Sequence, residues 1–375
     1  MGHYDIIIVG GGLAGLSSAL HLSNNGYAVL VCEKQSYPHH KVCGEYVSNE
    51  IMPYLEKLGI SLAEANAVSI DTLQLTTEKG KSITTALPLG GKGISRFTMD
   101  TLFYKKARAA GAKFKFQNVT AISFQKDCFE LKTIEGEMFT AKIVIGAYGK
   151  RSNLDKHLNR DFIRLKSSWL GVKAHYDYPE FPENRVALHN FKGGYAGLSK
   201  TETGAVNFCY LASYQSFQKE KNIDDFNRNV IMKNPFLASF LNNAKPIFDQ
   251  PLTIAQISFS PKTSVENHVL MCGDTAGLIH PLCGNGMAMA IHSAKIVSEL
   301  IHKFMTHSGY HRHQLEQDYH RQWNKAFGRR LWWARQLQPI LLSNGLSNIA
   351  MTTAIKTPGL LKKIIKNTHG KPIIC

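Results

Sequence analysis

The sequence lacks several features that would mark whole classes of protein. No apolar run reaches the roughly 18 residues that a membrane-spanning helix needs. The seven cysteines show no C-x-x-C spacing, which argues against a disulfide framework or a zinc site and for reduced thiols. The first residues lack the basic end and separate apolar region of a signal peptide, and no helix-turn-helix, zinc-finger or RNA-binding signature is visible. We therefore predict a cytoplasmic globular protein with no nucleic-acid partner and no metal site.

Acidic residues are scarce. The chain has 28 Asp and Glu against 44 Lys and Arg, which gives a formal charge of +16. From residue 301 onward, 12 Lys and Arg stand against only Glu316 and Asp318, so this region supplies +10 of that charge. It also holds Trp332, Trp333 and many aliphatic residues. This mixture is typical of a surface that lies on an anionic membrane. We expect peripheral contact with the inner face of the membrane, and a solvated helical cap is the alternative.

Residues 4–33 carry the strongest motif. An apolar strand pattern at 6–9 leads into Gly10, Gly12 and Gly15 at G-x-G-x-x-G spacing, followed by a helix pattern and a second strand pattern that ends at Glu33. In such a unit the first glycine permits a tight turn, the second lets the backbone approach a pyrophosphate, and the third allows close helix–strand packing. The helix N-terminus offers N–H groups to the phosphate, and the acid can accept hydrogen bonds from a ribose. The order and spacing predict a dinucleotide site in a Rossmann unit.

A second segment, residues 268–294, also combines a strand pattern with a glycine-rich turn and a helix pattern. A buried strand pattern ends at Gly273 and Asp274, where ligands bind in open α/β sheets. Gly284, Asn285 and Gly286 then open a helix whose amides would face an electron-rich ligand. On composition alone this segment is also compatible with an ordinary strand–loop–helix connection.

Together, GGGLAGL near residue 12 and GDTAGLIHPLCGNGM near residue 280 resemble the FAD-dependent superfamily of aromatic hydroxylases (p-hydroxybenzoate hydroxylase-like), flavin halogenases and geranylgeranyl reductases. The resemblance spans about residues 4–300. It implies FAD as the cofactor, with Asp274 on the ribityl chain. It also implies that Pro281, Gly284 and Gly286 lie beside the flavin ring.

Shorter segments resemble the geranylgeranyl reductase branch. Residues 41–48, KVCGEYVS, look like its C-G-x-x-x-S segment, and residues 193–197, GGYAG, look like its G-G-Y-x-W segment with Gly197 in place of the tryptophan. Residues 275–277, TAG, resemble the reductase pattern, whereas hydroxylases usually carry Ala-His there, and the W-x-W-x-I-P segment of halogenases is absent from the sequence. Arg96 matches the Arg-x-x-Leu/Met-Asp segment that contacts FAD in the superfamily.

The motifs and the resemblance together define the predicted site. The predicted cofactor-binding residues are Gly10, Gly12, Leu13, Ala14, Gly15, Glu33, Lys34, Lys41, Cys43, Gly44, Arg96, Gly273, Asp274, Gly284, Gly286 and Met287. Cys43, Tyr195 and Pro281 are the predicted catalytic residues. A packed thiol remains the alternative for Cys43, and a packed sheet aromatic remains the alternative for Tyr195. Glu45, a polar loop residue, is compatible with simple solvation.

One residue departs from the hydroxylase pattern. Where hydroxylases carry an Asp-Gly motif that helps both FAD and NADPH binding, this chain has Tyr148 before Gly149. The substitution puts direct use of NADPH in doubt, and no second G-x-G-x-x-G occurs. The electron donor is left open.

For the fold we predict an α/β protein. A Rossmann-type FAD-binding domain (glutathione reductase-like) should be formed by residues 1–65, 95–160 and 265–305. A mainly β substrate domain should be formed by 66–94 and 161–264, and a basic helical region by 306–375.

The predicted function is that of an FAD-dependent oxidoreductase acting on an apolar, lipid-like small molecule. The resemblance favours reduction of C=C bonds in a prenyl or polyene-like compound. The alternative is a flavin monooxygenase that hydroxylates an aromatic or polyketide-like substrate, because one fold supports both chemistries. A non-catalytic FAD-binding protein on a membrane is the third hypothesis.

Overall fold

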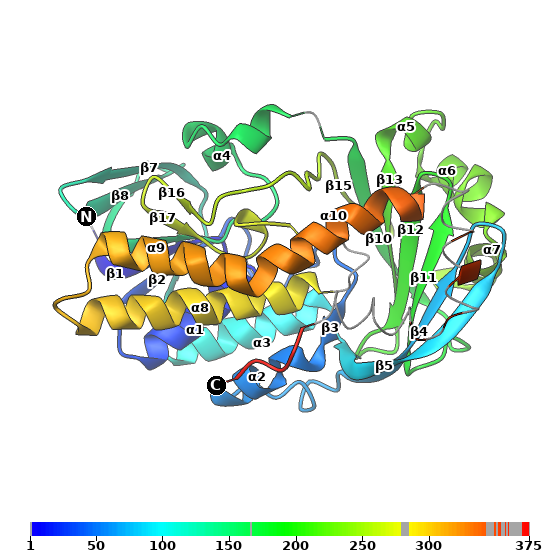
Figure 1. Cartoon of the computed structure of the whole chain (residues 1–375), viewed down its shortest axis with the longest axis horizontal. Helices are drawn as coiled ribbons and strands as arrows, with labels where there is room; N and C mark the ends of the chain where they lie inside the picture. The colour runs from blue at the N-terminus through cyan, green and yellow to red at the C-terminus, as the bar shows by residue number, and fades with distance from the viewer. Residues whose placement is uncertain are drawn as a thin grey trace.

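Two β-sheets and a layer of long helices form the molecule (Figure 1). The computed structural model describes residues 2–165, 167–278 and 285–342, together with 349, 352–353, 357, 359 and 370–374. The first sheet lies at the N-terminal side of the molecule, and the second forms its opposite end. Helix α10 (Arg329–Leu342) runs from the helical layer beside the first sheet toward the second (Figure 1).

The first sheet has eight strands, and its centre is parallel. Its main path runs β16-β17-β9-β1-β2-β6, with β7 and β8 continuing beyond β9. The bounds are β1 Gly2–Val9, β2 Val29–Cys32, β6 Lys113–Lys115, β7 Val119–Gln125, β8 Cys128–Thr133, β9 Met138–Gly146, β16 Val265–Glu266 and β17 Val269–Met271. Because β1, β2, β9 and β17 are parallel, their carboxyl ends meet at one edge, where Gly10, Glu33, Ala147 and Cys272 follow them.

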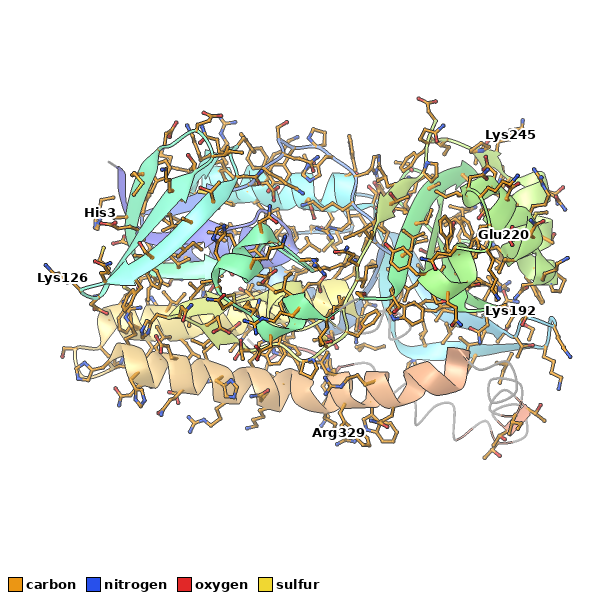
Figure 2. All side chains as sticks on the ribbon, turned by 90° about the horizontal axis from the view of Figure 1, so that it is seen from above. His3, Lys126, Lys192, Glu220, Lys245 and Arg329 are labelled. Carbon is orange, nitrogen blue, oxygen red and sulfur yellow. The ribbon has the colours of Figure 1, made fainter. Side chains whose placement is uncertain are left out.

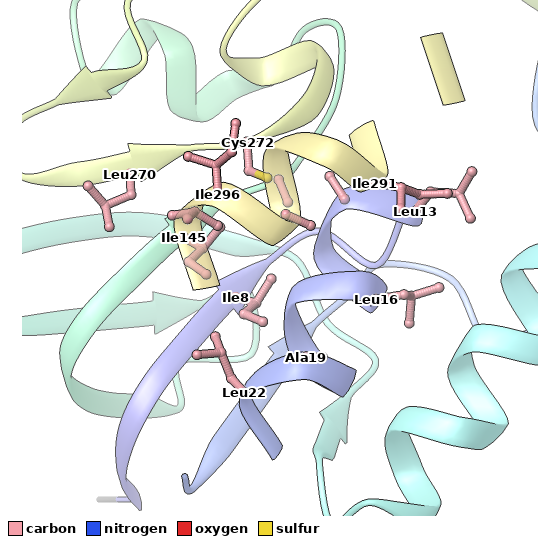
Figure 3. Close-up of a cluster of buried hydrophobic side chains, with 14 of the residues drawn as sticks. Ile8, Leu13, Leu16, Ala19, Leu22, Ile145, Leu270, Cys272, Ile291 and Ile296 are labelled. Atoms are coloured by element: carbon pink, nitrogen blue, oxygen red, sulfur yellow. The ribbon is translucent and has the colours of Figure 1, made fainter. Parts of the chain in front are cut away.

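Helices α1 (Leu13–Asn24), α3 (Arg96–Ala109), α8 (Gly286–Thr306) and α9 (Arg312–Trp323) belong to this half. Figure 3 shows Ile145 of β9 beside Ile296 of α8, and Ile8 of β1, Leu16 of α1 and Ile291 of α8 belong to the same buried core. Consecutive residues of β1, Ile6–Val9, and nearly the whole of α1 are buried, as expected for a parallel strand and helix at the centre of a covered sheet. A π-helical turn, Asn324–Gly328, joins α9 to α10.

The second sheet has nine strands in the order β14-β10-β13-β12-β11-β4-β5-β3, with β15 paired to β10. The bounds are β3 Tyr46–Ser48, β4 Val68–Thr76, β5 Ser82–Gly93, β10 Trp169–Asp177, β11 Arg185–Phe191, β12 Gly194–Lys200, β13 Val206–Ser213, β14 Lys245–Pro246 and β15 Leu252–Ile254. Helices α6 (Ile223–Asn229) and α7 (Pro235–Asn243) cover one face through buried aromatic residues such as Phe208 and Phe226. The other face carries the contacts that are described below.

Short helical segments complete the chain. They are η1 Asn49–Ile51, α2 Met52–Lys57, α4 Asn153–His157, η2 Asp161–Arg164, α5 Tyr214–Phe217, η3 Ile231–Lys233 and η4 Gly273–Thr275.

The predicted α/β fold with a helical C-terminal region is confirmed. The proposed domain boundaries stay a prediction. Strand β3, which precedes residue 65, pairs with β5 in the second sheet. Among the described residues, no helix is long and apolar enough to cross a membrane.

Candidate cofactor site

The glycine turn after β1 has the geometry that its spacing predicts. Gly10 adopts φ +108°, where L side chains are strained, and a side chain there would overlap the carbonyl of Ala147. A side chain at Gly15 would overlap the carbonyl of Gly10, so this glycine permits the close packing of α1 on the turn. Gly12 differs, because the nearest atom to a Cβ placed there is Nη2 of Arg96, at 3.7 Å. The backbone at Gly12 therefore borders space that a bound group can enter.

The N-terminus of α1 faces this turn without a side-chain cap. Gly12 is the N-cap residue in an extended conformation, and the first turn of the helix contains no acid. The first N–H groups of a helix have no partners within the helix. At Leu13 and Ala14 they therefore remain available to an anion, which the helix dipole also favours. A pyrophosphate fits this environment.

The side chains of Glu33 and Tyr37 stabilise the glycine turn through hydrogen bonds to Gly11. Glu33, buried at the end of β2, accepts a hydrogen bond from the N–H of Gly11 at 2.7 Å through Oε2. The Tyr37 hydroxyl donates to the Gly11 carbonyl at 2.6 Å. Burial, with Glu33 and Asp100 nearby, holds the pKa of Tyr37 far above its usual range, so the hydroxyl stays a donor. Glu33 thus supports the turn directly, while Lys34 next to it is exposed.

Two cations meet one buried acid beside the turn. Arg96 donates two hydrogen bonds of 2.7 Å to Asp100, and Nζ of Lys41 lies 3.1 Å from the same carboxylate. Burial alone would raise the pKa of Asp100, but Arg96 and Lys41 hold it below its usual range. The ionised Asp100 therefore fixes both cations near Gly11 and Gly12. Sequence reasoning named Arg96 and Lys41 but missed Asp100, which occupies the acid position of the Arg-x-x-Met-Asp segment.

The second glycine motif lies directly against the first. Gly273 adopts φ +64°, and a Cβ there would lie 2.9 Å from Cβ of Ala14 in α1. Its N–H donates to Oγ of Ser293 in α8 at 2.9 Å. Asp274 follows at the edge of the sheet and is partly exposed. Two motifs that are 260 residues apart in sequence are thus brought to one strand edge.

A partly buried lysine, Lys262, connects the loops that follow two strands at this edge. Nζ of Lys262 donates to the carbonyls of Asp274, at 2.9 Å, and Lys150, at 2.8 Å. Burial lowers the pKa of Lys262 to about 8. Lys262 was not identified from the sequence, which contains no local signal for it.

The flavin-ring segment is described only in part. Pro281 and Gly284, together with His280 and Cys283, lie outside the described residues. Gly286 begins α8, and Met287 is buried behind it. Because α8 packs on α1, the start of α8 lies in the same region as the glycine turn.

The loop after β2 contacts the second sheet through two of its backbone carbonyls. Nδ2 of Asn207 donates to the Cys43 carbonyl at 3.2 Å, and the Ser199 hydroxyl lies 3.4 Å from the Gly44 carbonyl. Gly44 is exposed, and a Cβ there would meet no atom within 4 Å. Gly44, a predicted site residue, therefore borders open space on its outer side, while its carbonyl contacts the second sheet.

Glu45 is not solvated, as its loop position had suggested, but fully buried at the contact between the two halves. It adopts φ +51° and accepts a hydrogen bond from His175 Nε2 at 2.6 Å, while its other oxygen contacts the buried ammonium of Lys173. The Arg96 N–H donates to it at 2.7 Å. Burial alone would raise the pKa of Glu45, but His175 and Lys173 hold it below its usual range. Lys173 and His175 alternate along β10, and only the fold shows that both meet this loop.

The predicted catalytic Tyr195 lies in an apolar cluster that extends beyond the second sheet. It is 4% exposed and packs with Leu211, Ile257 and Leu278, and Trp169 and Phe259 border the cluster. Leu278 is the last described residue before residues 279–284. Tyr195 belongs to this cluster, whereas Val9, Leu13 and Ala14 around the glycine turn belong to the core of the first half.

Tyr148, which stands where the hydroxylase pattern has an acid, is a partly buried neutral group. Its hydroxyl lies 3.6 Å from Sδ of Met271. Burial, with Asp155 nearby, raises the pKa of Tyr148 above its usual range. The site therefore has no anionic group at this position.

Comparison with known proteins agrees with this geometry. Residues 3–325 match the model of a family described as "FAD binding domain". Conditioned medium factor receptor 1 of Dictyostelium discoideum is 22% identical over 327 residues, which cover 79% of this chain and 62% of that protein. Digeranylgeranylglycerophospholipid reductase of Methanococcus vannielii is 25% identical over 342 residues, which cover 86% of this chain and 82% of that protein. The solved structure of the flavin-dependent brominase Bmp2 shares the fold, with a TM-score of 0.81 at 18% identity over 100% of this chain and 95% of that one.

Proposed function

The chain belongs to the FAD-binding domain family, and on that premise we propose that it reduces C=C bonds in an apolar prenyl or polyene-like compound. That it is an FAD-dependent oxidoreductase follows from the family and its enzyme members. The choice of reaction and substrate is the proposal.

The observation that carries this proposal is the apolar wall around Tyr195. Its members, Tyr195, Leu211, Ile257 and Leu278, extend from the second sheet to Leu278, which in sequence precedes the segment that the resemblance places beside the flavin ring. A wall of this kind favours an apolar substrate, because a polar one would lose hydrogen bonds to water without replacement. The similarity to a reductase of a prenyl lipid supports the same class.

FAD would supply two-electron redox chemistry to this site. We propose that the N–H groups at Gly12, Leu13 and Ala14 bind its pyrophosphate, with the cations of Arg96 and Lys41 nearby. Glu33 would accept from the ribose while its other oxygen supports the turn, and Asp274 would meet the ribityl chain. The remaining proposed cofactor-binding residues are Gly10, Gly15, Lys34, Gly44, Gly273, Gly284, Gly286 and Met287. Cys43, Tyr195 and Pro281 are proposed to line the reacting region. The roles of Lys34, Pro281 and Gly284 rest on the sequence alone.

The electron donor is part of the proposal. Because Tyr148 is neutral where hydroxylases carry an acid, we propose that NADPH reduces the bound flavin slowly or not at all. Stopped-flow bleaching of the flavin by NADPH tests this, and rapid bleaching that substrate stimulates would contradict it.

A second function is a flavin monooxygenase that acts on an aromatic or polyketide-like substrate. The fold is shared with a "probable FAD-dependent monooxygenase" of Pseudomonas aeruginosa, which supports this function. Turnover under air and under nitrogen separates the two, because only the monooxygenase requires oxygen. A non-catalytic FAD-binding protein is the least favoured, because the segments that the resemblance places beside the flavin ring are intact in the sequence.

We also propose peripheral membrane contact through the basic C-terminal region. Arg329 and Trp332 are exposed, and Figure 2 shows Arg329 on the outer side of the helical layer. The second predicted cluster, residues 360–366, lies outside the described residues.

Mass spectrometry of products from a cell lipid extract tests the proposed reaction. The FAD-loaded protein, reduced with dithionite, should add two hydrogens to an apolar component of the extract. The addition of one oxygen under air would instead establish the monooxygenase function. Protein that stays colourless after reconstitution with FAD would contradict both.

A further inference from the structure

One row of paired residues crosses the second sheet at right angles to its strands. Cα pairing joins Ile83 of β5 to Leu75 of β4, Leu75 to Leu188 of β11, and Leu188 to Gly197 of β12. Gly197 pairs with Cys209 of β13, and Cys209 pairs with Lys173 of β10. Paired residues share a face of the sheet, so this row, Ile83–Leu75–Leu188–Gly197–Cys209–Lys173, is a continuous track on one face. We call it the transverse row.

The residues in the middle of the transverse row are partly exposed, whereas their neighbours along β12 and β13 are buried. Within β12, Gly197 is the one position that is not buried. Cys209 is partly exposed between buried neighbours in β13, and Leu188 is partly exposed in β11. A Cβ at Gly197 would lie no closer than 3.5 Å to any neighbouring atom, Cδ2 of Leu188. The exposed positions on these strands thus line up instead of being scattered.

The flanking rows give the track its width. On one side Tyr195 and Leu211 are buried, and on the other Ser199 and Asn207 are buried. The partly exposed strip is therefore one residue wide at β12 and β13. A single-residue strip suits an unbranched or methyl-branched chain and is too narrow for a fused ring system.

The two ends of the transverse row differ in chemistry. Ile83, Leu75 and Leu188 form an apolar group at one end. At the other end Lys173 is fully buried against Glu45, whose neighbours Cys43 and Gly44 belong to the proposed cofactor site. Six strands about 4.8 Å apart give the row a length of about 24 Å. The buried ion pair closes the end nearest the cofactor site, and the apolar end points away from it.

We propose that the transverse row binds the long apolar chain of the substrate in an extended conformation, with Ile83 contacting only chains long enough to reach it. This inference rests on the proposed function and adds a chain-length requirement to it. The occupant is an isoprenoid-like chain, because the row from Ile83 to Cys209 has no charged side chain, is narrow, and is continuous with the Tyr195 wall through Leu188, which borders both clusters. The chain's own C-terminal segment is a competing occupant, since Lys81 at the start of β5 contacts Thr352.

The test measures binding separately from turnover. Equilibrium dialysis of radiolabelled geraniol, farnesol and geranylgeraniol is performed against the FAD-loaded full chain. In the unmodified protein we expect affinity to rise at least about tenfold from the ten-carbon to the twenty-carbon alcohol, because added buried methylenes strengthen binding. If affinity does not depend on chain length, the proposal is wrong, and the C-terminal segment becomes the preferred occupant.

Point variants locate the chain on the row. Ile83→Asn should weaken geranylgeraniol binding at least about tenfold, because it places an amide where the chain ends. It should leave geraniol binding unchanged. Thr84→Asn is the matched control, since this exposed neighbour in β5 faces the other side of the sheet and should change nothing. Gly197→Trp should abolish binding of all three alcohols by filling the open middle of the row.

FAD content and thermal unfolding of each variant show whether it is folded. Folded Ile83→Asn protein that binds all three alcohols as the parent does would overturn the proposal. If chain-length dependence is present but no alcohol or lipid is reduced, the row stands and the proposed reaction fails. If reduction occurs without any chain-length dependence, the proposed reaction stands and the proposed role of the transverse row is wrong.

Discussion

The glycine turn and the second sheet both contribute to the proposed site, but they are built in opposite ways. The turn uses Gly10, Gly12, Gly15 and Glu33 within 24 residues, and its key contact joins Glu33 to Gly11. The sheet side uses Glu45 and Lys173, which are 128 residues apart. Where local geometry makes a site, glycine spacing reveals it. Where charge burial makes a site, only the fold brings the partners together.

The largest expected effects are those of substituting Gly12 and Gly15, two glycines of one motif with different roles. Gly12→Val should reduce FAD affinity at least about 100-fold, which corresponds to about 2.7 kcal/mol, because the side chain enters the space left for pyrophosphate. The apoprotein should remain folded, since a Cβ there meets only Arg96, at 3.7 Å. Gly15→Val should instead prevent folding by overlapping the Gly10 carbonyl. Flavin absorbance and circular dichroism measure the two outcomes, and normal flavin content in Gly12→Val would show that this is not the phosphate turn.

The buried ion pair on the sheet side should behave unlike an exposed pair beside the turn. Lys173→Met leaves the Glu45 carboxylate buried without its ammonium, and we expect unfolding to become easier by about 3–5 kcal/mol. Glu45→Gln with Lys173→Met should recover part of that loss. Urea unfolding of the apoprotein measures it.

The control is Lys115→Met, which removes the exposed pair with Glu137 and should change nothing measurable. If Lys173→Met and Lys115→Met changed the free energy of unfolding equally, the buried ion pair would not differ from the exposed one.

Glu33→Ala should weaken FAD binding less than Gly12→Val. It removes a charged acceptor from the ribose and from Gly11, and hydrogen bonds to charged groups contribute about 1.5–3 kcal/mol each. We expect a dissociation constant that is about 10-fold to 100-fold higher by fluorescence titration. Gln35→Ala, an exposed neighbour, is the control. An effect as large as that of Gly12→Val would mean that the acid, and not the open backbone, dominates the site.

Acid should destabilise both halves through buried histidines. Burial lowers the pKa of His21, beside the first sheet, to about 4, and burial with Arg185 nearby lowers that of His189, in the second, to about 3. Because the unfolded chain binds the proton near pH 6.5 and the folded chain does not, stability is lost as pH falls below 6.5. Between pH 6.5 and 5, each histidine should contribute about 2 kcal/mol of that loss.

His21→Gln and His189→Gln should each reduce the pH dependence, as measured by urea unfolding at pH 7 and pH 5. Unchanged pH dependence in both variants would show that other groups control acid stability.

The smallest effect concerns the outer surface of the helices. Replacing both Arg329 and Trp332 by alanine should reduce flotation with anionic vesicles about fivefold at low salt, because each basic residue near such a surface contributes roughly 1 kcal/mol. Lys192 and Lys245, at the far end of the molecule in Figure 2, provide the control pair. Parent protein that does not float would exclude membrane contact and leave the FAD assignment intact.

The cofactor side of the molecule was largely predictable from sequence, for a local reason. Gly10 at φ +108° and the close approach of Gly15 are backbone requirements that one residue type meets, so the motif itself carries them. The Gly273–Asp274 strand end was also identified, because a buried strand pattern followed by an acid marks a ligand edge. Asp100 was missed, although its position in the Arg96 segment was a usable signal.

By itself, the sequence determined the cofactor class, the Rossmann unit and the strand edge at which the two glycine motifs meet. Only the tertiary structure decided that Glu45 is buried and paired, that Lys173 and His175 reach it, and that Gly197 opens a row across six strands. The physical reason is the range of the interactions. Backbone conformation depends on neighbours within a few residues, whereas burial, ion pairing and strand register depend on residues that are far apart in the chain and become adjacent only when the two halves pack.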